Sequence, residues 1–229
     1  MIKLISNNDQ NLYQCRNFIF VRHGQTSWGP ADIAKGPLNL ELNEVGRYQA
    51  TNAYNLASAN YPITNPIIYS SHLKRALETA HIFASYFGKD KPKPSIIQIE
   101  GLQERYYGDY RNVDRGIPYP SEQLCWERRI PLWLRGDVIK QELDLPADAE
   151  SIEDFRCRIR ETIQKIFNET YPLGPNHTLI LVSHQKVFEF LAESLADKKL
   201  KLNQGGVCYF RFSNGKYVVE VIEPNVIEI

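Results

Sequence analysis

The chain has 229 residues, and 43% of them are hydrophobic, so it can bury the sizeable core of one large domain. Its 27 Lys and Arg residues balance its 27 Asp and Glu residues, so we expect no nucleic-acid partner, and any basic site must be local. The longest apolar runs have about four residues, far below the roughly 20 of a membrane span, so we expect no membrane partner.

The N-terminal residues 1–9 turn polar too early for a secretory signal peptide, so we expect a cytoplasmic protein. The cysteines are scattered without a C-x-x-C pair, which favours reduced thiols over a disulfide framework or a zinc site. The histidines lack H-x-H and H-E-x-x-H spacings, so we expect no metal centre. The four cysteines are Cys15, Cys125, Cys157 and Cys208.

The first part of the chain alternates strand and helix patterns. An apolar run predicts a strand over 17–21. An alanine-rich pattern predicts a helix over 42–59 with Asn43 as its N-cap. A second apolar run predicts a strand over 67–70, which leads directly into a helix over 71–87.

The middle of the chain is less regular. A strand is predicted over 95–99. The stretch of about 106–149 is interrupted by prolines and predicts a helical or irregular excursion over the sheet. After it, Ser151 and Asp154 resemble a capping box, so a helix should begin there and end before Pro172.

The last part of the chain predicts a strand over 178–183 that leads into a helix over 184–196. Two further strands, 207–212 and 217–222, flank an Asn-Gly pair, which is a strong hairpin signal. Strand–helix alternation that ends in an antiparallel pair predicts an α/β fold. We expect a mostly parallel, mixed sheet covered by helices on both faces, with a C-terminal hairpin.

Ionisable side chains follow the predicted strands at the points where the strands end. Arg22 and His23 follow the first strand, and Arg75 lies in the first turn after the second. His184 follows the strand over 178–183, and Glu104 lies in a loop after the strand over 95–99. In an open α/β sheet, ligands bind at the carboxyl ends of the strands, so these side chains can share one site.

The residue types in this set suit chemistry on a phosphate. An imidazole can act as a nucleophile near neutral pH, and a guanidinium binds a pair of phosphate oxygens well. A carboxylic acid can protonate the leaving oxygen. The set therefore supplies a nucleophile, fixed cations and a proton donor without a metal or other cofactor, and a small phosphorylated substrate is expected.

Four ordered motifs resemble those of the histidine phosphatase superfamily, which contains the cofactor-dependent phosphoglycerate mutases. The resemblance covers most of the chain and implies a three-layer α/β/α sandwich, formed here by a single domain over 1–229. The motifs are RHGQT (22–26), SSHLKRALETA (70–80), LQERYYG (102–108) and VSH (182–184).

The resemblance also implies residue roles. His23 would be phosphorylated in a covalent intermediate. Arg22, Arg75 and His184 would hold the phosphoryl group, and Glu104 would donate a proton to the leaving group.

The chain departs from the family pattern at three positions near these motifs. Gly29 stands where many members have Asn, Lys35 where many mutases have Ser or Thr, and Gln185 where Gly is frequent. We expect Gln25 and Lys35 to contact the substrate together with Arg22, Arg75 and His184. The alternative for Lys35 is a solvated loop lysine.

The leading interpretation is a phosphomonoester hydrolase that uses His23 as the nucleophile and Glu104 as the general acid and base. A cofactor-dependent phosphoglycerate mutase is the alternative. The region after Glu104, however, looks too short and too different from the corresponding region of a mutase. A non-catalytic protein that binds a phosphorylated ligand is an alternative of another class. The substrate, the oligomeric state, the roles of Arg128 and Arg129, and the effects of Gly29 and Gln185 stay open.

Overall fold

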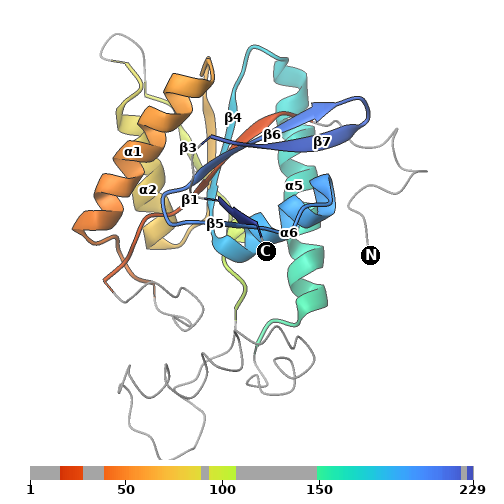
Figure 1. Cartoon of the computed structure of the whole chain (residues 1–229), viewed down its shortest axis with the longest axis horizontal. Coiled ribbons are helices and arrows are strands. Elements are labelled where there is room, and N and C mark those ends of the chain that lie inside the picture. The colour runs from red at the N-terminus through yellow and green to blue at the C-terminus, as the bar shows by residue number, and fades with distance from the viewer. Residues whose placement is uncertain (1–15, 28–38, 89–92, 107–148, 223–225, 229) are drawn as a thin grey trace, which may run out of the picture. The chain divides into compact units, whose positions relative to one another are not determined.

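The computed structural model describes residues 16–27, 39–88, 93–106, 149–222 and 226–228 (Figure 1). The chain forms two compact units. The first consists of Met1–Ser27, Asn39–Glu104 and Arg158–Ile229, and the second of Trp28–Leu38 and Arg105–Cys157. The predicted excursion over 106–149 lies almost entirely outside the described residues.

A six-stranded sheet forms the centre of the first unit. Its strands are β1 (Phe18–Arg22), β2 (Ile67–Ser70), β3 (Ile96–Gln98), β4 (Leu179–Ser183), β6 (Val207–Ser213) and β7 (Lys216–Val221). They lie in the order β3-β2-β4-β1-β6-β7. The pairings from β3 to β1 are parallel, and those from β1 to β7 are antiparallel. The predicted mixed sheet and its C-terminal hairpin are therefore confirmed.

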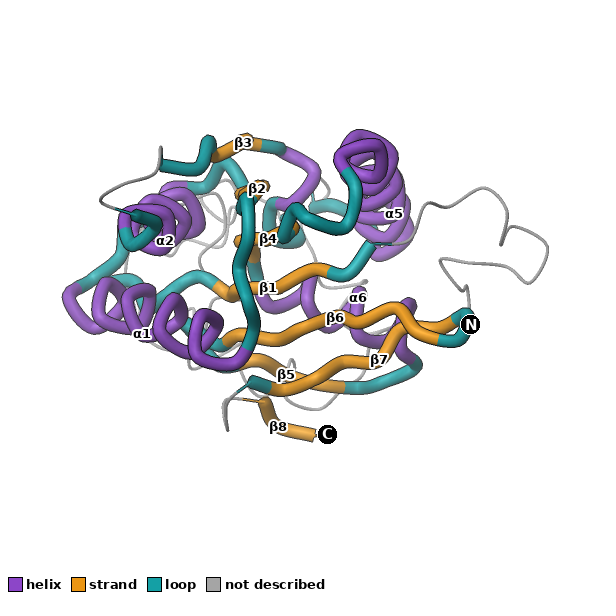
Figure 2. Tube along the Cα trace, turned by 90° about the horizontal axis from the view of Figure 1, so that it is seen from above, coloured by secondary structure: helices purple, strands orange, loops and turns teal. Residues whose placement is uncertain are grey.

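Helices cover both faces of this sheet (Figure 2). α1 (Glu44–Asn60) and α2 (Lys74–Ser85) lie on one face. α6 (Gln185–Ala196) and the part of α5 (Ile152–Thr170) that belongs to the first unit lie on the other. The result is the predicted α/β/α arrangement. Among the described residues, no helix combines the length and apolar character needed to cross a membrane.

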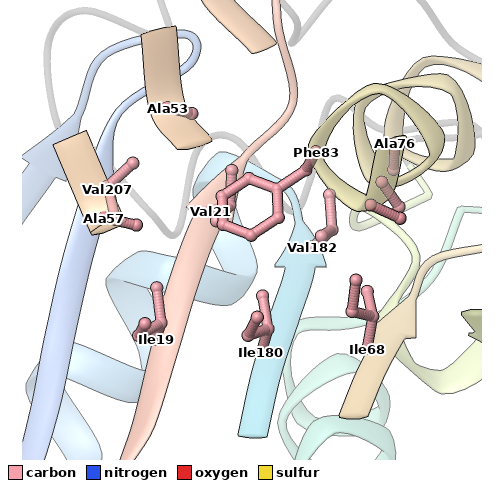
Figure 3. Packing of buried hydrophobic residues seen from close by; sticks show 12 residues of the cluster. Ile19, Val21, Ala53, Ala57, Ile68, Ala76, Phe83, Ile180, Val182 and Val207 are labelled. Atoms are coloured by element: carbon pink, nitrogen blue, oxygen red, sulfur yellow. The ribbon is translucent and has the colours of Figure 1, made fainter. Parts of the chain in front are cut away.

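The sheet buries side chains on both faces, and its central strands are accordingly apolar up to their last residues, Arg22, Ser70 and Ser183. In β1, Ile19 and Val21 pack against α1 and α2 in the cluster that Figure 3 shows. Phe18 and Phe20 alternate with them and point to the opposite face of the sheet. There the ring centroid of Phe20 lies 5.5 Å from that of Phe188 in α6. The labelled residues of the cluster are Ile19, Val21, Ala53, Ala57, Ile68, Ala76, Phe83, Ile180, Val182 and Val207.

Two predicted helix caps are present. The Gly46 N–H donates to Asn43 Oδ1 at 2.8 Å, so Asn43 caps α1. In the second unit, the Asp154 N–H donates to Ser151 Oγ at 3.0 Å, and that hydroxyl donates to the Asp154 carboxylate at 2.8 Å. These bonds satisfy backbone donors that a helix N-terminus leaves without intrahelical partners.

The described part of the second unit also connects the start of α5 to an earlier segment. Arg105 donates two hydrogen bonds to the carbonyl of Glu150, at 3.1 and 3.2 Å. The Tyr106 N–H donates to the Glu150 carboxylate, and the Glu150 N–H donates to the Tyr106 carbonyl. Hydrogen bonds from both backbone and side chains therefore connect residues 105–106 to Glu150, which lies more than 40 residues later in the sequence.

The prediction that α2 begins at Ser71 is wrong. The Ser71 N–H donates to the Val182 carbonyl, and Ser71 Oγ accepts the Leu73 N–H, so residues 71–73 form a tight connection and the helix begins at Lys74. Short elements without a detectable period were also missed. They are β5 (Leu200–Leu202), β8 (Val226–Glu228) and the 3-10 turns η2 (Glu100–Leu102) and η4 (Tyr171–Leu173).

Candidate active site

The carboxyl ends of β1, β4 and β2 lie side by side. Arg22 pairs with Ser183 in the sheet register, and Ser70 pairs with Val182. Just beyond the strand ends, the His23 N–H donates to the Ser183 carbonyl at 3.0 Å. Parallel pairing therefore brings His23 and His184, which the sequence pattern places after strand ends, to one edge of the sheet together with Ser71.

His23 is fully buried, and its neighbours determine which ring nitrogen carries the proton. Nδ1 lies 2.7 Å from the Gly24 carbonyl, which can only accept, so Nδ1 must be protonated. Arg75 Nε–H donates to Nε2 at 3.2 Å, so Nε2 presents a lone pair. The ring is therefore held as the neutral tautomer that can attack an electrophile through Nε2.

The loop that carries His23 packs unusually closely against α1. A Cβ atom on Gly24 would lie 2.3 Å from the Gly46 carbonyl oxygen, and one on Gly46 would lie 2.0 Å from the Gln25 carbonyl oxygen. The Gly24 N–H also donates to Thr79 Oγ1 at 3.2 Å. Glycine at both positions therefore permits the backbone contact that positions the imidazole.

His184 is the second buried histidine at this edge. Its ring centroid lies 5.0 Å from that of His23, and its Nε2 lies 2.8 Å from Ser71 Oγ. His184 is also the residue immediately before α6. The helix N-terminus and its partial positive charge therefore lie beside the ring, an arrangement that favours an anion.

Arg22 is held at the end of β1 by the last residue of β5 and by the turn that follows β5. Its Nη1 donates to the Leu202 carbonyl at 2.6 Å, and its N–H donates to the Gly206 carbonyl at 3.0 Å. The Leu202 N–H in turn donates to Gln185 Oε1 at 3.2 Å. Gln185, where the family frequently has Gly, is therefore linked to the backbone that holds Arg22.

Glu104 is largely buried, with 9% of its surface exposed. The Lys186 N–H, in the first turn of α6, donates to its carboxylate at 3.2 and 3.4 Å. This contact places the carboxylate at the same helix N-terminus that His184 precedes. The structure thus brings Arg22, His23, Arg75, Glu104 and His184 to one end of the sheet of the first unit.

The other predicted substrate contacts have different positions. Gln25 is half-buried, and its side-chain oxygen accepts from Asn43 Nδ2 at 2.9 Å, so it supports the cap of α1. Lys35 lies outside the described residues, as do Gly29, Arg128 and Arg129. The sequence reasoning did not identify Ser71 or Thr79, because a single hydroxyl residue has no distinguishing pattern.

The arrangement combines a nucleophilic nitrogen, cations, a second imidazole and a carboxyl group in a mostly buried setting. Such a set can bind a phosphate monoester and transfer its phosphoryl group, because fixed cations stabilise the charge that develops. Within the described ranges, no group of three or more His, Cys, Asp or Glu residues could hold a metal ion.

Known proteins resemble this chain over most of its length. The family model of the histidine phosphatase superfamily (branch 1) matches residues 18–223. Phosphoglycerate mutase-like protein 4 of Arabidopsis thaliana is 30% identical over 89% of this chain and 83% of its own. The metal-independent phosphoserine phosphatase of the same plant is 26% identical over 88% and 79%.

A solved structure shares the fold. It is a mycobacterial glucosyl-3-phosphoglycerate phosphatase, which is 22% identical, with a TM-score of 0.63 over 90% of this chain and 98% of that one. Together with the four motifs and the edge of the sheet where their side chains meet, these matches show that the chain belongs to the histidine phosphatase superfamily (branch 1).

Proposed function

We propose that this protein hydrolyses small phosphate monoesters through a phosphohistidine on His23. One observation carries the proposal: Arg75 donates to Nε2 of a buried imidazole whose Nδ1 proton is held by the Gly24 carbonyl. A histidine held this way has its nucleophilic nitrogen aimed toward a guanidinium, which is the group that binds a phosphate.

In the first half-reaction, the lone pair on His23 Nε2 attacks the phosphorus atom and the bond to the ester oxygen breaks. Glu104, protonated at this stage, gives its proton to that oxygen, and the alcohol leaves. Arg22, Arg75 and His184 stabilise the negative charge on the phosphoryl oxygens during the transfer.

In the second half-reaction, the Glu104 carboxylate accepts a proton from water while the water oxygen attacks phosphorus. The nitrogen–phosphorus bond breaks, inorganic phosphate leaves, and His23 regains its neutral form with Glu104 protonated again. One carboxyl group therefore acts first as an acid and then as a base, and the Lys186 N–H holds it in place.

The nucleophile is tested by trapping the intermediate. The wild-type protein, quenched during turnover of a radiolabelled aryl phosphate, should carry acid-labile label, and His23→Ala should carry none. His81→Ala, which removes an exposed histidine of α2, should be labelled as the wild type is. Label that persists in His23→Ala would show that another residue is the nucleophile.

The competing activity is that of a phosphoglycerate mutase, because one relative is named phosphoglycerate mutase-like and others are named 2,3-bisphosphoglycerate-dependent phosphoglycerate mutases. The test supplies 3-phosphoglycerate with catalytic 2,3-bisphosphoglycerate. Release of inorganic phosphate supports the hydrolase. Rapid formation of 2-phosphoglycerate without phosphate release would establish the mutase instead.

A protein that only binds phosphorylated ligands is the third candidate. The presence of all five catalytic residue types at one edge of the sheet argues against it. Absence of phosphate release from an aryl phosphate at every pH from mildly acidic to neutral would favour it.

A further inference from the structure

The turn that presents Glu104 is held from behind by α5. A single nitrogen, Arg158 Nη1, donates to the Gly101 carbonyl at 2.8 Å and to the Gln103 carbonyl at 3.1 Å. Arg158 lies more than 50 residues away from both acceptors in the sequence. Its side chain is only partly buried.

Two other contacts hold the same turn. Ser183 Oγ donates to the Leu102 carbonyl at 2.6 Å, so three consecutive carbonyls, 101 to 103, each accept from a side chain. A Cβ atom on Gly101 would lie 1.7 Å from Thr162 Oγ1, so the turn also packs directly on α5. The turn therefore has little room to shift along the helix.

Glu104 follows these three carbonyls directly, and its carboxylate meets α6 through the Lys186 N–H. These bonds are 3.2 and 3.4 Å long. Because Glu104 is the next residue after the held turn, the backbone of that turn determines where the Glu104 side chain begins and in which direction it extends.

We infer that Arg158 is a positioning residue for the proton donor: through the Gly101 and Gln103 carbonyls it holds the turn that aims Glu104 at the leaving oxygen. This inference rests on the proposed function. Displacing a catalytic group by about 1 Å can cost two orders of magnitude in rate.

The leaving group distinguishes this role from a purely structural one. A p-nitrophenolate leaves without protonation, whereas the alkoxide of glycerol phosphate needs a proton in the transition state. A misaimed Glu104 therefore slows the alkyl ester selectively, whereas a loosened fold slows both esters. The quantity compared is kcat/KM, because it reports the transfer to His23 and not the later release of phosphate.

The experiment measures kcat/KM on p-nitrophenyl phosphate and on glycerol phosphate for the wild type, Arg158→Met, Arg158→Lys and Glu104→Gln. Arg156→Gln is the matched control, because Arg156 lies on the same helix and contacts Glu153 at the surface. For Arg158→Met we expect a loss of about 10- to 100-fold on glycerol phosphate and less than about threefold on p-nitrophenyl phosphate.

On the alkyl ester, kcat/KM should fall less for Arg158→Lys than for Arg158→Met, because one ammonium can donate to both carbonyls as Nη1 does. Thermal unfolding shows whether Arg158→Met is folded at the assay temperature. If Arg158→Met is unfolded, the presence or absence of an alkyl-selective loss of kcat/KM in Arg158→Lys tests the positioning role of Arg158.

Equal losses on both esters in the folded Arg158 variants, or no loss on either, would overturn the inference. If Glu104→Gln shows the selective loss and the Arg158 variants do not, only this inference fails. If Glu104→Gln slows both esters equally, or the wild type hydrolyses neither, the proposed general acid fails and the inference fails with it.

Discussion

Single side chains at the strand ends of this protein have their orientation imposed by backbone groups. The Gly24 carbonyl fixes the His23 tautomer, the Leu202 carbonyl holds Arg22, and the Lys186 N–H meets Glu104. Backbone positions are in turn set by the sheet and by the Gly24–Gly46 contact. Pre-organisation of this kind lets donors stabilise developing charge without reorganising during the reaction.

Arg75→Lys tests whether the guanidinium is needed in this geometry. Lysine keeps the charge but has no planar fork, and it cannot both meet Nε2 and bind two phosphate oxygens. We expect kcat/KM on p-nitrophenyl phosphate to fall about 100-fold, as for loss of a fixed donor to a transition-state oxygen. Lys74→Gln, a change in the exposed neighbour that pairs with Glu41, should have less than about a twofold effect. An Arg75→Lys rate close to that of the wild type would contradict the assigned role.

At the scale of elements, the loop after β1 and the start of α1 form one hydrogen-bonded unit. Asn43 caps the helix through Oδ1, and its Nδ2 donates to Gln25 Oε1 and to the Thr26 carbonyl. The Gln25 N–H donates to Gln49 Oε1, six residues further along than Asn43. The cap of α1 is therefore also an attachment for the loop that carries His23.

Asn43→Ala should destabilise the protein by about 1 kcal/mol, the usual loss for an N-cap. Denaturant unfolding measures the change. Asn55→Ala, at an exposed position within the same helix, is the control and should be neutral or slightly stabilising because alanine favours helix. Identical unfolding midpoints for the two variants would show that the cap contributes nothing.

At the scale of the whole first unit, polar contacts connect the sheet to the helices on its faces. Tyr69 of β2 is buried, and its hydroxyl donates to Glu169 of α5 at 2.8 Å. Burial, followed by this hydrogen bond to a carboxylate, raises the pKa of Tyr69 to about 12. The neutral phenol is therefore the form that the fold stabilises.

This shift predicts how stability depends on alkaline pH. Tyr69 ionises near its ordinary pKa of about 10 in the unfolded chain but near 12 in the folded one, so its contribution is complete below pH 10 and is lost as the pH rises toward 12. The difference in unfolding free energy between wild type and Tyr69→Phe should therefore narrow over that range. Denaturant titrations at successive pH values measure this difference in unfolding free energy. A difference that stays constant from pH 10 to pH 12 would refute the contribution of Tyr69 ionisation to stability.

Much of the fold could be predicted because its long elements are strongly patterned. The strand over 67–70 was predicted with its observed bounds, and β1, β4, β6 and β7 differ from their predictions by one residue at the ends. The Asn-Gly hairpin is also confirmed, and Asn214 and Gly215 adopt the positive φ angles, 52° and 77°, that its turn requires. The start of α2 was mispredicted because Ser71 is engaged by a strand and a loop distant in sequence.

The five side chains of the proposed site can be identified in the sequence because each follows a predicted strand within a few residues. The carboxyl ends of parallel strands lie at the same edge of a sheet, so these side chains are brought together. The groups that orient them are not identifiable in the sequence. Ser71, Thr79, Leu202 and Arg158 act through hydrogen bonds to residues far apart from them in the chain. The local pattern determines which residues bear the chemistry, because hydrophobic period and strand order are encoded over short windows. Their orientation is decided by the folded backbone, because it depends on carbonyl and N–H groups that every residue has and that only tertiary packing brings within hydrogen-bond distance.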